Sequence, residues 1–111
     1  MLRRSFTAVL EKNTLLRDYF ETEPYEAGWA TEARWFVRVL EVEGDGELRV
    51  HPQISPDGLH WCDEGSNPLR ITGRGLESLP LTNFGSWLRL QGEFVGGLDS
   101  VRVLIYLALK G

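Results

Sequence analysis

Apolar residues recur at every second position through most of this chain, which is the spacing of a β-strand and not of a helix. The stretch 47–55 shows the alternation most clearly. One of its faces is polar, and the other carries Leu48, Val50, Pro52 and Ile54. Such a strand is half-buried, with one side on a core and the other in water.

The last strand, from Val101 to Lys110, is apolar on both faces. One face carries Val101, Val103, Ile105, Leu107 and Leu109. The other carries Leu104, Tyr106 and Ala108. Two apolar faces indicate a central strand, or a strand whose second face is covered by a partner subunit.

Two antiparallel hairpins are predicted from the turn residues. Gly44-Asp45-Gly46 would join a strand over Arg34–Glu43 to the strand over Glu47–Ser55, because glycine tolerates positive φ. The segment 95–100 would likewise join Ser86–Phe94 to Val101–Lys110.

Short strands and turns fill the remainder, and Glu21–Thr31 reads as a long acidic and aromatic loop. Ser55-Pro56-Asp57-Gly58 fits a β-turn. The other expected strands are Ser5–Glu11, Leu15–Phe20 (joined near Asn13), Leu59–Asp63, Leu69–Gly73 and Leu76–Leu79. We therefore expect residues 1–111 to form one all-β domain, an antiparallel β-sandwich of about eight strands. A jelly roll is the favoured topology and a barrel the alternative.

Charge and cysteine content exclude several classes of partner. The chain has 12 Lys and Arg against 16 Asp and Glu, and its arginines are scattered, so we expect no nucleic-acid partner. Cys62 is the single cysteine and cannot close an internal disulfide, which favours a cytoplasmic protein. The opening MLRRSFTAVLEKN matches neither a signal peptide nor a membrane span, so no membrane partner is expected.

Metal and catalytic signatures are weak. Six possible metal ligands fall within fourteen residues without a zinc-like spacing: His51, Asp57, His60, Cys62, Asp63 and Glu64. Cys62, near a tryptophan, is better read as a small buried apolar residue. Ser55 lies four residues from His51, roughly 13 Å along a strand, too far for a catalytic pair, so its expected role is to start the turn.

Four carboxylates gather in the segment 18–26 without the Asp-x-Asp-x-Asp-Gly spacing of a calcium site: Asp18, Glu21, Glu23 and Glu26. We therefore expect no catalytic residue, no metal and no cofactor.

Aromatic residues carry most of the remaining information. Trp35, Trp61 and Trp87 are expected in the core. Tyr25 and Trp29 lie in the long loop, where rings can contact a subunit or stack on a sugar. Phe84 and Tyr106 complete the set of candidate interface or ligand residues.

The hairpin leading into Ile54-Ser55-Pro56-Asp57-Gly58-Leu59-His60-Trp61, the segment 81–90 (LTNFGSWLRL) and the end Leu107-Ala108-Leu109-Lys110 resemble small β-sandwich proteins encoded in phage and prophage structural regions. The likeness covers roughly Trp35 to Lys110 and leaves the first 34 residues unmatched. The Ser-Pro-Asp-Gly-x-x-Trp element is also similar to a hairpin of discoidin-type carbohydrate-binding sandwiches. The resemblance implies a module that assembles on a larger particle.

The sequence therefore favours a non-enzymatic, self-associating protein of a decoration, tail or shell type, forming homo-oligomers and joining a larger assembly. Tyr25, Trp29 and Tyr106 would be buried against a symmetry mate. The alternative is a carbohydrate-binding module that uses loop aromatics.

Overall fold

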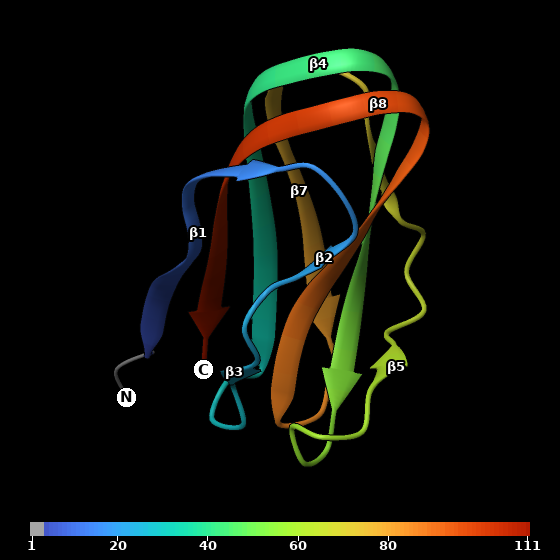
Figure 1. Cartoon of the computed structure of the whole chain (residues 1–111). Helices are drawn as coiled ribbons and strands as arrows, with labels where there is room; N and C mark the ends of the chain where they lie inside the picture. The colour runs from blue at the N-terminus through green and yellow to red at the C-terminus, as the bar shows by residue number, and fades with distance from the viewer. Residues whose placement is uncertain (1–3) are drawn as a thin grey trace.

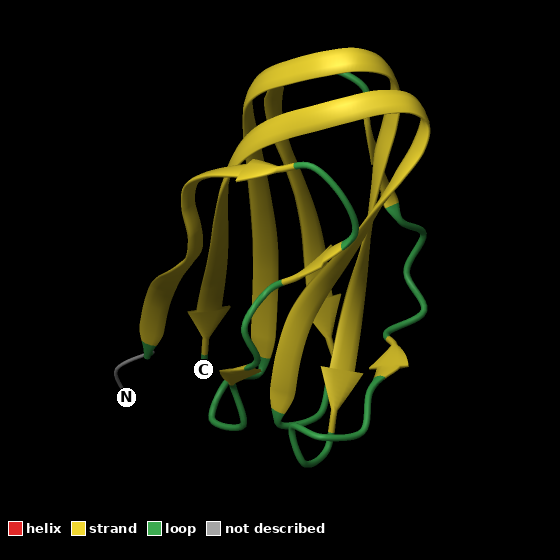
Figure 2. Cartoon of the chain, viewed as in Figure 1, coloured by secondary structure: helices red, strands yellow, loops and turns green. Residues whose placement is uncertain are grey.

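The computed structural model describes residues 4–111 as an all-β chain of eight strands (Figures 1 and 2). The strands are β1 (Ser5–Leu16), β2 (Phe20–Glu21), β3 (Tyr25–Glu26), β4 (Glu32–Ser55), β5 (Cys62–Asp63), β6 (Leu69–Ile71), β7 (Gly75–Thr82) and β8 (Trp87–Lys110). All pairings are antiparallel, which confirms the expected fold class. No helix in this range could span a membrane.

Two strands of 24 residues, β4 and β8, form the centre of the structure. They pair with each other along their whole lengths, from Glu32 with Lys110 to Ser55 with Trp87. Figure 1 shows the pair rising together, bending over and descending again, so that one ladder spans both halves of the molecule.

Glycines occupy the bend of both strands, which we call the arch (residues 43–46 of β4 and 96–99 of β8). Gly46 pairs with Gly96, and Asp45 pairs with Gly97. A Cβ added to Gly46 would lie 2.3 Å from the carbonyl oxygen of Val95, so a larger residue does not fit between the two backbones. Gly44 adopts a φ of +95°, which glycine accepts without strain. The arch thus requires glycine at positions 44 and 46, because a residue with a side chain would collide with the opposite strand.

The two predicted hairpins are wrong. Gly44-Asp45-Gly46 does not pair Arg34–Glu43 with Glu47–Ser55; it bends β4 while both segments keep β8 as their partner, and the segment 95–100 does the same for β8. A glycine cluster relaxes the backbone in the same way for a tight turn and for a strand bend. The partner across the sheet decides between them, and that partner is remote in sequence.

The bend creates two halves of one sheet. In one half β1, β8, β4 and β7 lie in that order, and in the other β2 and β3 pair with β8 while β5 and β6 pair with β4. Residues 4–111 thus form one hydrogen-bonded sheet that folds over itself. The finer descriptions, a β-sandwich and a jelly roll, stay predictions.

A single apolar cluster fills the space between the halves. The alternation predicted for the last strand is confirmed, because Val101, Val103, Ile105, Leu107 and Leu109 are all buried. Trp35 is fully buried, as expected. Trp61 and Trp87 are only half-buried and lie outside the cluster, so the prediction that they fill the core is wrong.

The peripheral strands differ from the expected boundaries. The two strands expected before residue 21 are one long β1, interrupted by bulges near Asn13 (φ +54°), and a separate short β2. The expected loop 21–31 contains β3, which pairs with the start of β8. Thr22 fixes the same segment, since its Oγ1 accepts a hydrogen bond from the Leu90 N–H at 2.9 Å.

The arch yields a stability prediction. We expect Gly46→Ala to lower the free energy of unfolding by about 2–4 kcal/mol, because its Cβ would meet backbone atoms on β8 that cannot move alone. Gly73→Ala is the matched control, since a Cβ there meets nothing within 4 Å. Urea unfolding of both variants measures the difference, and equal stability of the two would contradict the steric role of the arch.

Candidate functional site

The outer face of the half formed by β1, β8, β4 and β7 is the first candidate site. Across three strands, Val9 pairs with Tyr106, and Tyr106 pairs with Phe36. Their sequence neighbours Ala8, Leu107 and Trp35 are buried, so the three side chains point away from the core. An apolar row therefore crosses the solvent side of the sheet, with Tyr106 at its centre.

More apolar groups extend this row. Leu104 and Ala108 flank Tyr106 on the same side of β8, and both are partly exposed. On the edge strands Val9 is 53% exposed and Leu76 is 59% exposed. The prediction that the last strand has a second apolar face is confirmed, and that face is open to solvent in this chain.

Cationic side chains border the row. Arg34 and Arg38 point outward from β4, and the Arg34 Nη1 donates a hydrogen bond to the Ser78 Oγ at 2.8 Å. Arg102 lies 3.5 Å from a carboxylate oxygen of Glu41. A hollow of about 250 Å³ opens beside the row, lined in part by Arg34, Phe36, Pro80, Ala108 and Lys110. The outer face therefore combines exposed apolar groups with guanidinium groups.

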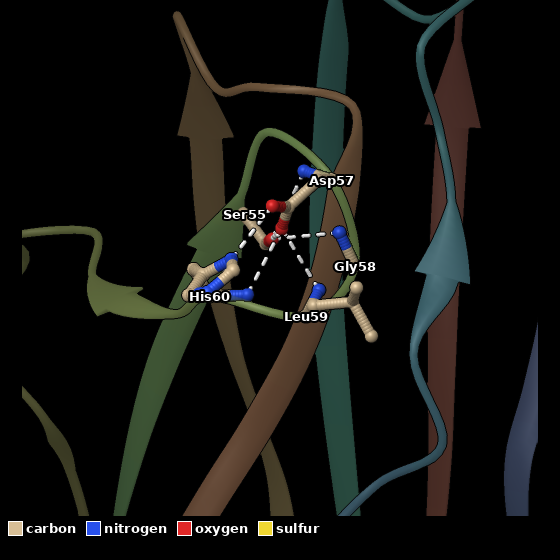
Figure 3. Close-up of polar contacts among 5 residues, drawn as sticks. All are labelled: Ser55, Asp57, Gly58, Leu59 and His60. Atoms are coloured by element: carbon tan, nitrogen blue, oxygen red, sulfur yellow. Dashed lines mark hydrogen bonds and ion pairs between the residues drawn. The ribbon is translucent and has the colours of Figure 1, made fainter.

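The Ser-Pro-Asp-Gly turn forms a closed hydrogen-bond network (Figure 3). The buried Ser55 Oγ accepts hydrogen bonds from the N–H groups of Asp57 and Gly58, at 3.2 and 2.8 Å, and lies 3.0 Å from the Asp57 Oδ1. The Asp57 Oδ1 also accepts from the N–H groups of Leu59 and His60, both at 2.9 Å. The expectation that Ser55 starts the turn is confirmed.

Electrostatics support the same interpretation of the turn. The backbone N–H of His60 and its ring Nδ1, which lies 2.7 Å from the Asp57 Oδ2, hold the pKa of Asp57 well below its usual value. His51 lies on β4, outside the turn, and its Nε2 is 3.4 Å from a carboxylate oxygen of Glu93. The polar groups of the turn are thus engaged with one another in a structural role.

The possible metal ligands around this turn do not converge. Within residues 4–111 the structure brings together no group of three or more His, Cys, Asp and Glu side chains. Cys62 is exposed on the short β5, so the expectation of a buried cysteine is wrong. The physical reason is that β5 is a two-residue edge strand, too short to have a covered side.

Two of the candidate aromatics, Tyr25 and Trp29, lie together at the end of the molecule where Arg4 and Gly111 meet. They line a hollow of about 220 Å³ with Arg4, Ser5 and Phe6, which we call the end groove. Phe6 stacks against Tyr25 with ring centroids 6.4 Å apart. The Arg4 guanidinium covers Trp29 at 4.1 Å, so that ring face is already occupied.

The remaining candidates are separated from this groove. Phe84 is partly buried and packs against the core, while Tyr106 lies on the outer face. Sequence reasoning did not select Val9, Phe36 and Leu76 for the outer face, or Phe6 for the end groove. The alternation along β4 indicates that Phe36 faces away from the core. Which residues lie beside Phe36 on the neighbouring strands depends on the pairing register, which no local sequence pattern determines.

No protein-family model matches this chain, and no curated protein matches it.

The turn yields a pH prediction. Because the pKa of Asp57 is lowered in the folded state, its carboxylate contributes stability above the usual value of 3.8, and that contribution is lost as the pH falls below it. We expect Asp57→Asn to lower the melting temperature at about pH 6 and to have much less effect near about pH 2. Thermal unfolding across this range tests it, and a pH-independent difference would contradict the role of the ionised carboxylate.

Proposed function

We propose that this protein is a non-enzymatic structural module that self-associates through its outer face. The observation that carries the proposal is the apolar row Val9, Tyr106 and Phe36 on the solvent side of the sheet. In an antiparallel sheet, the face that is exposed to water normally carries polar residues. Here β8 keeps Leu104, Tyr106 and Ala108 on that side, which is typical of a face that another protein covers.

The distribution of exposed apolar residues also supports the outer face as the surface of self-association. Within residues 4–111, six large apolar residues are well exposed, and three of them lie on the outer side of this half: Val9, Leu15 and Leu76. Their gathering on one face distinguishes them from the scattered exposed residues of any protein surface. Aromatic and arginine side chains together are also what the centres of protein interfaces favour.

Charge favours a second copy of this chain as the occupant. The outer face carries four cationic residues, Arg34, Arg38, Arg102 and Lys110, against the carboxylates of Glu32 and Glu41. The chain as a whole has a net charge of −4, so the rest of its surface has a larger acidic excess than the chain itself. Each copy therefore offers both members of a complementary pair of surfaces.

We assign no catalytic residue. The most strongly shifted carboxyl group, that of Asp57, has its oxygens engaged by Leu59, His60 and Ser55 in the turn. The resemblance to β-sandwich proteins of phage structural regions supports a place in a larger, phage-like particle, as a decoration, tail or shell component. The cytoplasm remains the expected compartment outside such a particle.

A carbohydrate-binding module is the second candidate, and the end groove is the observation that favours it. The stacked rings of Phe6 and Tyr25 lie beside Trp29 at one hollow. Since Arg4 covers Trp29, a sugar ring would stack on Phe6 or Tyr25. An oligosaccharide that protects tryptophan fluorescence from quenching would support this function, and a blank glycan screen would count against it.

Self-association has a direct test. We expect light scattering to show oligomers of the wild-type chain at tens of micromolar, and Tyr106→Lys to shift them to monomers by placing an uncompensated charge in the apolar row. Val9→Lys, at an exposed edge position, is the second variant for the case that Tyr106→Lys folds poorly, and it should also give monomers.

The control for both variants is Leu59→Lys. Leu59 is 79% exposed at the Ser-Pro-Asp-Gly turn, away from the outer face, so this variant should assemble like the wild type. A monomeric wild-type chain would contradict the proposed function, as would equal effects of all three substitutions.

A further inference from the structure

We infer that the copies associate head to tail, with the acidic arch of one copy against the cationic, β7 side of the outer face of the next. This inference rests on the proposed function, because it names the surface that covers the outer face. It follows from where the unneutralised charges of the chain lie.

The β7 side of the outer face carries arginines without a partner. Arg38 on β4 and Arg74 just before β7 flank an open hollow that is also lined by Gly75 and Leu76. Both arginines are exposed, and neither guanidinium group has an ion pair or hydrogen bond within residues 4–111. Guanidinium groups beside an exposed leucine are suited to a segment that offers carboxylates and some apolar surface.

The arch offers such carboxylates. Glu43, Asp45 and Asp99 are exposed there, and the stretches 42–48 and 90–101 contain no Lys, Arg or His. In the part of the chain that the structure describes, none of the three has a cationic partner. The arch is also a bent, protruding pair of backbones, as Figure 1 shows, so it can reach a neighbouring molecule.

Other carboxylates of the chain are mostly engaged. Glu21 lies 3.0 Å from the Arg89 Nη2, and the Glu26 Oε1 accepts a hydrogen bond from the Gly28 N–H at 2.7 Å. Glu47 lies 3.1 Å from the Arg49 Nε, and Asp57 is held by His60. The arch is therefore the acidic surface that best complements Arg38 and Arg74.

A face-to-face dimer is disfavoured by the same charges. A two-fold interface places one patch against its own copy, so Arg34 and Arg38 of both molecules would face a surface with an excess of cations. A head-to-tail contact avoids this repulsion. Such a contact produces a ring if the rotation closes and a filament if it does not.

Charge-reversal variants of the full chain test the contact by sedimentation velocity. The arch variant carries Glu43→Lys and Asp45→Lys, and the face variant carries Arg38→Glu and Arg74→Glu. Each alone should raise the dissociation constant at least about tenfold. Mixing the two variants should restore association into assemblies that contain them in equal numbers, because each arch then meets a face of opposite charge.

A matched control carries Asp18→Lys and Glu23→Lys, which changes net charge as the arch variant does but lies elsewhere, and it should associate like the wild type. Circular dichroism verifies that every variant folds. The inference is overturned if the mixture does not associate, or if the control weakens association as much as the arch variant. If the wild type assembles and Tyr106→Lys blocks it while the arch variant behaves normally, the head-to-tail contact fails and the proposed function stands. A monomeric wild-type chain removes both.

Discussion

The backbone ladder between β4 and β8 is the interaction on which the rest of this structure depends. It continues across a bend because Gly44, Gly46 and Gly97 let two backbones approach where side chains would collide. Each strand thereby supplies both halves of the sheet, and the inward side chains of the two halves meet in one core. The shorter strands β1 and β7 add to one half, and β2, β3, β5 and β6 add to the other.

Alternation was enough to predict an all-β chain and to identify the buried face of Val101–Lys110, because strand side chains obey a strict period of two. It did not determine which strands pair. Gly44-Asp45-Gly46 is compatible with a hairpin and with a bent strand, and only the distant β8 decides between them. Trp61 and Cys62 were misplaced for a related reason: they lie at a sheet edge, where burial depends on which segments cover them.

The candidate site was partly predictable in the same sense. Tyr106 follows from the two apolar faces of one strand, which are visible in the sequence. Its neighbours Val9 and Phe36 come from strands far away in the chain and become its neighbours only through register. Likewise Tyr25 and Trp29 were recognisable as loop aromatics, but the ring of Phe6 and the cover of Arg4 over Trp29 are products of the fold.

The central ladder also has a consequence for the order of events in folding. No pair of the ladder is local in sequence: Glu32 pairs with Lys110, and even the two partners that are closest in sequence are Ser55 and Trp87. The strands that follow β4 directly in the chain, β5, β6 and β7, pair with one of its edges early, but closing the long loops to β8 costs conformational entropy before the contacts of the ladder form. During synthesis β4 emerges well before β8, so the edge of β4 that faces β8 has no partner until residues 87–110 have been made. The chain therefore exposes one unpaired edge of a 24-residue strand until its last strand is made, and an unpaired strand edge favours aggregation.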